Sequence, residues 1–188
     1  KKLKDLYAPN DSKWQVDEGS VLDQKYLKSI GKFDIIYSWG VLHHTGDMWK
    51  GLNNILIPLK KNEESFFVIS IYNDQGRKSQ IWKTIKKTYN KSKILSFLIK
   101  LLFIPSYTVL YAIFGFIYHK NPAWYFINYK KSRGMSIYYD WIDWLGGYPY
   151  EVSKPDQINS FFRKKGFVLE NLITTNSLGC NQYVFKKY

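Results

Sequence analysis

The strongest chemical signal in the sequence is a pair of adjacent histidines that follows a strand-like run. Residues 33–46 read F-D-I-I-Y-S-W-G-V-L-H-H-T-G and contain Gly40, His43 and His44 near their end. Histidine titrates near neutral pH, so His43 or His44 is a candidate general base. An ordinary helix N-terminus with one capping histidine is the alternative. Adjacent histidines rarely bind one ion and no third ligand stands at a suitable spacing, so we predict no metal site.

The elements around these histidines are expected to alternate between strand and helix. Such an order is typical of an α/β fold with a doubly wound, mostly parallel sheet. Ligands bind outside the carboxyl ends of the strands in these sheets, which places Ser38, Trp39 and Gly40 beside a binding crevice. In chain order we expect a β-like run within 14–23, a helix over 24–30, a strand over 33–39, a helix over 48–58 and a strand over 66–72.

Composition limits the classes of partner. The 188 residues, 45% of them apolar, are enough for one globular core. A net charge of +13 favours an anionic partner such as nucleic acid, a phospholipid surface or a phosphorylated substrate. Nucleic acid is disfavoured because the lysines are scattered along the chain and there is no RNP-type motif, C2H2 spacing or Gly-Arg-rich tract. The single cysteine, Cys180, excludes an internal disulfide and agrees with a cytoplasmic location.

An apolar segment interrupts the alternation after residue 80. We expect a lysine-rich helix over 81–89 and then two helices within 94–118, separated at Pro105. Three alternatives remain for 94–118: a lid on its own domain, a membrane-surface hairpin that makes a peripheral membrane contact, or a membrane span. Basic residues on both sides would suit an anionic membrane. They are Lys86, Lys87, Lys91, Lys93, Lys120, Lys130, Lys131 and Arg133.

The last third of the chain is expected to be ordered. Residues 133–150 are too rich in aromatic side chains for a linker, 155–165 should form an amphipathic helix, and 167–174 with 182–185 an antiparallel pair at the sheet edge. We therefore divide the chain into a core over 1–80, an apolar helical insertion or lid over 81–132, and a last part over 133–188 that holds an aromatic substrate-side segment, the closing helix and the β-pair.

Several motifs resemble the class I S-adenosylmethionine (SAM)-dependent methyltransferase family. In that family an F-D-x-(I/V) strand leads into an L-H-H turn, as at residues 33–44 here. The chain is most similar to a bacterial subgroup of undefined substrate. The resemblance implies a Rossmann-like methyltransferase fold, SAM as cofactor and a small-molecule or lipid-like methyl acceptor. The subgroup motifs present here are S-W-G-V-L-H-H-T-G, I-Y-N-D, R-G-M-S, D-W-I-D-W-L-G-G-Y-P-Y-E and G-C-N-Q-Y-V-F.

The resemblance also implies roles for individual residues. The segment that receives the adenine corresponds to Gly19, Ser20 and Val21, where the family usually has an acidic or polar side chain. The methionine part of SAM would run past Ser38, Trp39 and Gly40, with Leu42 and His43 beside the sulfonium. The residues predicted to face or position the substrate are Tyr72, Asn73, Arg133, Asp140, Trp141 and Tyr148.

One departure from the family concerns the start of the chain. The glycine-rich first loop and the acidic residue after the second strand are absent, and the sequence begins at Lys1 without a methionine. We therefore expect an N-terminally truncated fragment, which binds SAM weakly or not at all, while its longer parent carries the activity. The alternatives are a membrane-associated methyltransferase acting on a lipid, and a non-catalytic binding module derived from the same fold.

Overall fold

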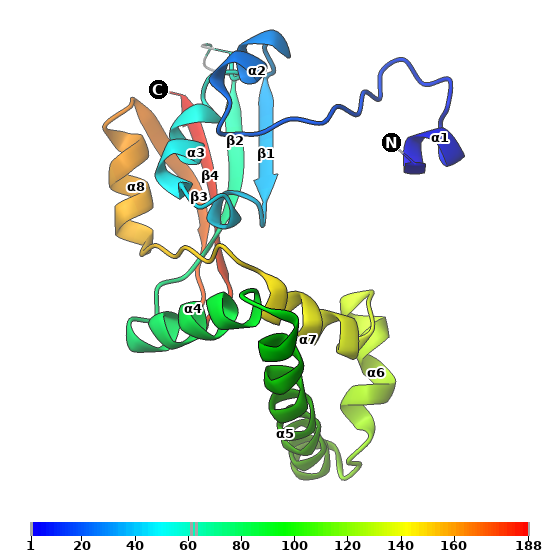
Figure 1. Ribbon diagram of the computed structural model, residues 1–188. Helices are drawn as coiled ribbons and strands as arrows, with labels where there is room; N and C mark the ends of the chain where they lie inside the picture. The colour runs from blue at the N-terminus through cyan, green and yellow to red at the C-terminus, as the bar shows by residue number, and fades with distance from the viewer. Residues whose placement is uncertain (1, 61, 63, 188) are drawn as a thin grey trace. The chain divides into compact units, whose positions relative to one another are not determined.

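The computed structural model describes residues 2–60, 62 and 64–187, which form two compact units. The first unit comprises Lys1–Ser70, Asn159–Ile173 and Gln182–Tyr188, and the second comprises Ile71–Ile158 and Thr174–Asn181. Figure 1 shows a sheet with neighbouring helices in the first unit and a group of helices in the second.

The sheet has four strands in the order β1-β2-β4-β3. Strands β1 and β2 are parallel, with Ile35 paired to Phe66, and β3 and β4 are antiparallel. The predicted α/β class and the antiparallel pair at the sheet edge are therefore confirmed, and the sheet is mixed. The strands are β1 (Ile35–Trp39), β2 (Phe66–Tyr72), β3 (Phe167–Ile173) and β4 (Cys180–Lys187).

Two helices of the first unit begin at aspartate caps. The Asp23 carboxylate accepts hydrogen bonds from the backbone N–H groups of Lys25 and Tyr26, and the Asp47 carboxylate accepts one from Lys50. Such caps satisfy amides that have no partner inside the helix, so the sequence fixes where these helices start. The helices that lie wholly or mostly in the first unit are α1 (Lys2–Tyr7), α2 (Gln24–Ser29), η1 (Leu42–His44), α3 (Met48–Asn54) and α8 (Pro155–Arg163).

The core of the first unit is built on Phe67 of β2. Its ring centroid lies 4.6 Å from that of Phe162 in α8 and 5.2 Å from those of Phe167 and Phe185 in β3 and β4. All four rings are buried. The predicted inward position of Phe162 is confirmed, and the alternation of β2 explains why Phe67 points into this core while Phe66 points away.

The two faces of β1 have different surroundings. The parallel register places Ile36 and Ser38 on the same face as Phe67. Ile35, Tyr37 and Trp39 lie on the other face and are 45 to 66% exposed. Within the part of the chain that the structure describes, this second face of β1 is open to solvent.

The β-like run expected within 14–23 does not form a strand. Residues 13–20 have no regular secondary structure, and a turn at 21–22 leads into α2. A strand requires a neighbour that supplies ladder hydrogen bonds, and none of the described strands pairs with this segment. The β-like composition of this run was therefore not a sufficient signal here.

The second unit is helical and is held together by aromatic side chains. Phe103, Tyr107 and Tyr111 follow one face of α5, and their rings contact Trp141 of α7 at centroid distances of 5.5 to 6.3 Å. The turn into α6 packs on Gly115, where a Cβ would lie 2.7 Å from the Asn121 carbonyl oxygen. The helices are α4 (Arg77–Tyr89), α5 (Lys93–His119), α6 (Trp124–Arg133) and α7 (Ile137–Gly146).

The predicted break at Pro105 is wrong, because α5 is one continuous helix with this proline inside it. Proline removes one backbone donor and crowds the preceding turn. Two neighbouring hydroxyls bond to carbonyls of that turn: Ser106 Oγ donates to Leu102 O at 2.7 Å, and Thr108 Oγ1 to Ile104 O at 2.8 Å. A hairpin formed by two halves of 94–118 is therefore excluded. By length and composition α5 could cross a membrane, which is weak evidence for a span.

Candidate functional site

The turn that follows β1 leaves open space above its glycine. Gly40 has a φ of 71°, a left-handed conformation that residues with a Cβ rarely adopt. A Cβ built on Gly40 would meet no atom within 4 Å. The glycine is therefore required by the backbone and not by packing. Its half-buried backbone lies at the carboxyl end of a parallel strand, where α/β folds bind ligands.

Helix α3 holds the segment around Val21 against this turn. A Cβ on Gly51 of α3 would lie 3.3 Å from the Leu42 side chain and 3.8 Å from that of Val21. Asn54 Nδ2 also donates to the Val21 carbonyl at 3.1 Å. Two segments that the sequence assigned to one cofactor site are thus brought together, although they are about 20 residues apart in the chain.

Several predicted cofactor residues also have structural tasks. Leu42 is 1% exposed and packs on α3. Gly19 lies under the ring of Tyr26, so that a Cβ there would be 2.1 Å from a ring carbon. Ser20 Oγ accepts a hydrogen bond from the Leu22 amide at 3.2 Å, which shapes the turn before α2. This bond uses one of the two hydroxyl lone pairs of Ser20.

The two histidines differ in accessibility. His43 is 1% exposed, whereas His44, also in η1, is half-buried and partly accessible to solvent. Their rings meet edge to face at a centroid distance of 4.5 Å. Trp39, on the exposed face of β1, stacks on Tyr37 with centroids 5.9 Å apart. Of the two candidate bases, His44 is the better placed to meet a molecule from solution.

In the second unit, Arg133 and Asp140 form an ion pair. Arg133 Nη2 lies 3.1 Å from Asp140 Oδ2, and Tyr129 donates its hydroxyl hydrogen bond to the same oxygen. Asp140 raises the pKa of Arg133, and burial together with Asp140 raises the pKa of Tyr129 to about 12. Tyr129 was not predicted from the sequence, since only the packing of α6 against α7 brings it to Asp140.

Arg133 and Tyr129 also line a pocket of about 560 Å³. Its walls combine aromatic rings with amide, hydroxyl and guanidinium groups, which suits a ligand with an apolar body and a polar end. The lining residues are Tyr111, Trp124, Tyr125, Asn128, Tyr129, Ser132 and Arg133.

The other predicted substrate residues are dispersed within the second unit. Trp141 is buried in the aromatic cluster of α5. Tyr72 packs on Trp144 and Tyr150, with centroid distances of 5.7 and 5.1 Å, and burial raises its pKa. Tyr148 is partly exposed, and its amide donates to Gly146 O at 2.7 Å. Only Arg133, Asp140 and Trp141 belong to the α5–α6–α7 cluster.

Asn73 is tied to the loop that precedes β4. Its Nδ2 donates to the carbonyls of Thr175 and Ser177 at 2.7 and 3.3 Å, and its Oδ1 accepts from Asn181 Nδ2 at 3.1 Å. These bonds use both amide hydrogens of Asn73, so the side chain has a structural role. Its role in positioning a substrate stays a prediction. The G-C-N motif contains Asn181, but nothing in that motif indicates which residue it contacts.

Lys86 of α4 is buried in an aromatic environment. Its side chain is 0% exposed, its Nζ donates to the Trp144 carbonyl, and this nitrogen lies 3.8 Å from the Trp144 ring centroid. Burial lowers the pKa of Lys86 to about 8. A lysine in a basic helix is normally exposed, and the sequence offered no signal that this one is not.

Replacing Lys86 with methionine should change how stability depends on pH. Because the pKa of Lys86 is about 8 in the folded protein and the usual lysine pKa is 10.5, the unfolded chain binds more protons between these two pH values. Stability of the wild type should therefore rise across this window, by at most about 3 kcal/mol, and the Lys86→Met variant should lack this rise. Urea unfolding at several pH values measures the free energy of unfolding of both proteins. If this free energy changed with pH in the same way in the two proteins, the lowered pKa of Lys86 would be contradicted.

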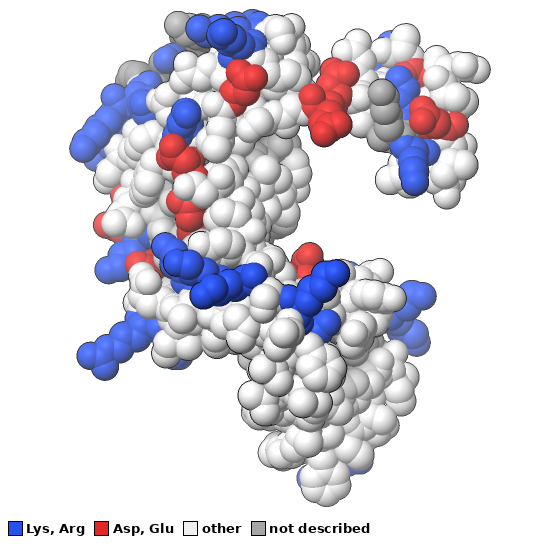
Figure 2. Space-filling model, viewed as in Figure 1, with Lys and Arg blue, Asp and Glu red and all other residues white. Residues whose placement is uncertain are grey.

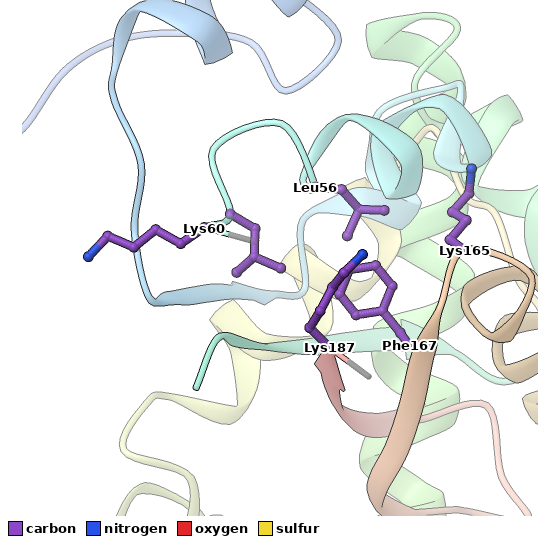
Figure 3. A pocket seen from close by; sticks show the side chains of 6 residues that line it. Leu56, Lys60, Lys165, Phe167 and Lys187 are labelled. Carbon is purple, nitrogen blue, oxygen red and sulfur yellow. The ribbon is translucent and has the colours of Figure 1, made fainter. Parts of the chain in front are cut away.

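A smaller pocket in the first unit is bordered by three lysines. Figure 3 shows that the amino group of Lys60 extends away from those of Lys165 and Lys187. Lys60 pairs with Asp34 at 2.8 Å, Lys165 donates to Asn53 Oδ1 at 2.8 Å, and the Lys187 nitrogen lies 5.1 Å from the Phe167 ring centroid. Since the three amino groups do not converge on one point, we assign no anion site to this pocket.

Comparisons with known proteins bear on the fold. No protein-family model matches the sequence, and no curated protein matches it. Among solved structures, PKMT2 from Rickettsia typhi in complex with AdoHcy is similar with a TM-score of 0.50 and 15% identity, over 90% of this chain and 38% of that one. The chain has a methyltransferase-type Rossmann-like fold.

A second solved structure matched in the comparison is an O-methyltransferase family protein from Burkholderia thailandensis. Its TM-score is 0.46 and its identity 8%, over 92% of this chain and 35% of that one. The chain thus spans a little over a third of the length of both matched proteins.

Proposed function

We propose that the protein to which this chain belongs transfers a methyl group from SAM to a small-molecule or lipid-like acceptor. The observation that carries the proposal is the open turn at Gly40, at the carboxyl end of a parallel strand and next to the two histidines. The fold supports it, because a similar structure was solved with AdoHcy, the form that SAM takes after losing its methyl group.

The residues at this turn fit such a cofactor. Gly40 lets the backbone approach a ligand closely. Ser38, two residues earlier in β1, adds a hydroxyl group. Ser20 has a remaining lone pair for an adenine amine, and Val21 offers an apolar surface on the same segment. SAM supplies an activated methyl group on a positively charged sulfur. The protein has to hold the acceptor in line with that carbon–sulfur bond.

His44 is proposed to remove the acceptor's proton. A general base must reach the acceptor from the site, and His44 is the histidine of the pair that is not fully buried. His43 packs edge to face against it and restricts the orientation of its ring, so we assign His43 a positioning role.

The proposal predicts that His44→Gln lowers methyl transfer by about 100-fold or more, because positioned proton transfer contributes that much. In the assay, the complete gene product is incubated with cell extract and with SAM that carries tritium in its methyl group. Tritium is then counted in the chloroform-soluble and the water-soluble fractions of the extract. His119→Gln is the matched control, since His119 stacks on Trp124 in the second unit. Equal loss in both variants, or wild-type activity in His44→Gln, would refute the base role. No transfer by the wild type would favour the non-catalytic alternative.

A further inference from the structure

Helix α5 has two faces of different character. Its aromatic stripe of Phe103, Tyr107 and Tyr111 packs on the chain's own α6 and α7. The residues on the opposite face are apolar and 47 to 73% exposed. Their spacing of three, four and seven residues aligns them along one side of the helix. This α5 ridge consists of Leu98, Leu102, Val109, Ile113 and Phe116.

The ridge is too extensive to be incidental exposure. It follows most of a helix of 27 residues, about 40 Å long, and carries no charged side chain. Lys100 belongs to the stripe side, because it precedes Phe103 by three residues and borders a pocket with Tyr138 of α7. Figure 2 shows the surface over α5 almost without charged side chains, with basic ones at its border. Continuous apolar surfaces of this kind mark interaction sites.

The distribution of charge around the ridge indicates the kind of partner. Residues 75–139 contain 12 lysines and arginines and no aspartate or glutamate, whereas the rest of the chain has 16 basic and 15 acidic residues. Nearly all of the net charge of +13 therefore belongs to the segment that carries the ridge. A second copy of the chain would present the same positive charge and be repelled. An anionic lipid surface offers negative charge and an apolar interior together.

We propose that the α5 ridge binds the surface of an anionic lipid bilayer, with α5 lying in the plane of the interface. A spanning orientation is disfavoured by α6, which returns alongside α5. Tyr129 of α6 lies 6.5 Å from Tyr111 between ring centroids, and Lys130, Lys131 and Arg133 follow it directly. A span would take these cations into the hydrocarbon, whereas at the interface they meet lipid headgroups. The proposal does not depend on the methyltransferase assignment.

The test is co-sedimentation of the complete gene product with two kinds of vesicle, phosphatidylcholine alone and phosphatidylcholine with about 30% phosphatidylserine. We expect binding to the anionic vesicles that weakens at high salt. The triple variant Leu102→Gln, Val109→Gln and Ile113→Gln should bind about tenfold or more weakly, because three apolar side chains no longer enter the interface. Bound wild-type protein should be released by alkaline carbonate.

The matched control replaces three exposed apolar residues of the first unit by glutamine: Leu3, Leu6 and Ile173, which are 53 to 74% exposed. This control should bind vesicles like the wild type, and circular dichroism should show that all variants are folded. Absence of vesicle binding, equal binding by the ridge variant, or resistance to carbonate would each overturn the proposal. Self-association that the ridge variant abolishes, without vesicle binding, would assign the ridge to a second copy instead.

Discussion

Gly40→Val is expected to abolish SAM binding by the complete gene product, with at least a hundredfold loss of affinity, while the protein stays folded. A valine there would be forced into a left-handed φ of 71° and would place its side chain in the open space above the turn. The backbone strain should cost about 1–2 kcal/mol of stability, and the larger effect should be exclusion of the ligand. Equilibrium dialysis with labelled SAM measures the affinity.

Gly31→Val separates the loss of ligand from backbone strain. Gly31 has a φ of 92°, its built Cβ also meets no atom within 4 Å, and it lies before β1 rather than after it. The two variants should therefore be destabilised to a similar extent, but only Gly40→Val should lose SAM. Equal affinity in both variants would show that the Gly40 turn is not the cofactor site.

Phe67→Ala should lower the free energy of unfolding of the first unit by about 4 kcal/mol. Phe67 is fully buried and contacts three other phenylalanine rings, so its removal leaves a cavity that these rings cannot fill without leaving their own contacts. Since domains are stable by only about 5–15 kcal/mol, the variant should be close to unfolding at physiological temperature.

Urea unfolding followed by tryptophan fluorescence tests this prediction, with Phe66→Ala as the neighbouring control. Phe66 lies on the opposite face of β2 and is only half-buried, so the same truncation should cost clearly less. Similar losses in the two variants would contradict the assignment of the core to the Phe67 face.

The sequence predicted elements whose determinants are local. The strand over 66–72 and the helix that starts after Asp23 are confirmed, because apolar runs and caps act within a few residues. The run within 14–23 was misjudged, because strand formation depends on a distant partner. The break at Pro105 was misjudged, because Phe103 and Tyr107 pack on Trp141 of α7 on both sides of the proline, and a contact with a residue so far along the chain is not visible in the local sequence. The division of the chain at residues 80 and 132 stays a prediction.

The candidate site was predictable only in part. The turn at Gly40 could be located from the strand before it, but the burial of His43 and the exposure of His44 depend on packing in three dimensions. The pairing of Asn73 with Asn181 joins residues 108 positions apart, and the contact of Lys86 with Trp144 joins residues 58 positions apart. Without an indication of which segments meet, residue type alone does not identify such pairs.

The most direct test of the central claim is ultraviolet cross-linking of labelled SAM to the complete gene product, followed by identification of the modified peptide. The account predicts a saturable cross-link, competed by AdoHcy, within the peptide that contains Trp39, Gly40 and His44. The 188-residue chain alone, assayed beside it, reports how much of the cofactor site this chain provides. A label confined to other peptides, or one that AdoHcy does not displace, would contradict the placement of the cofactor at the end of β1.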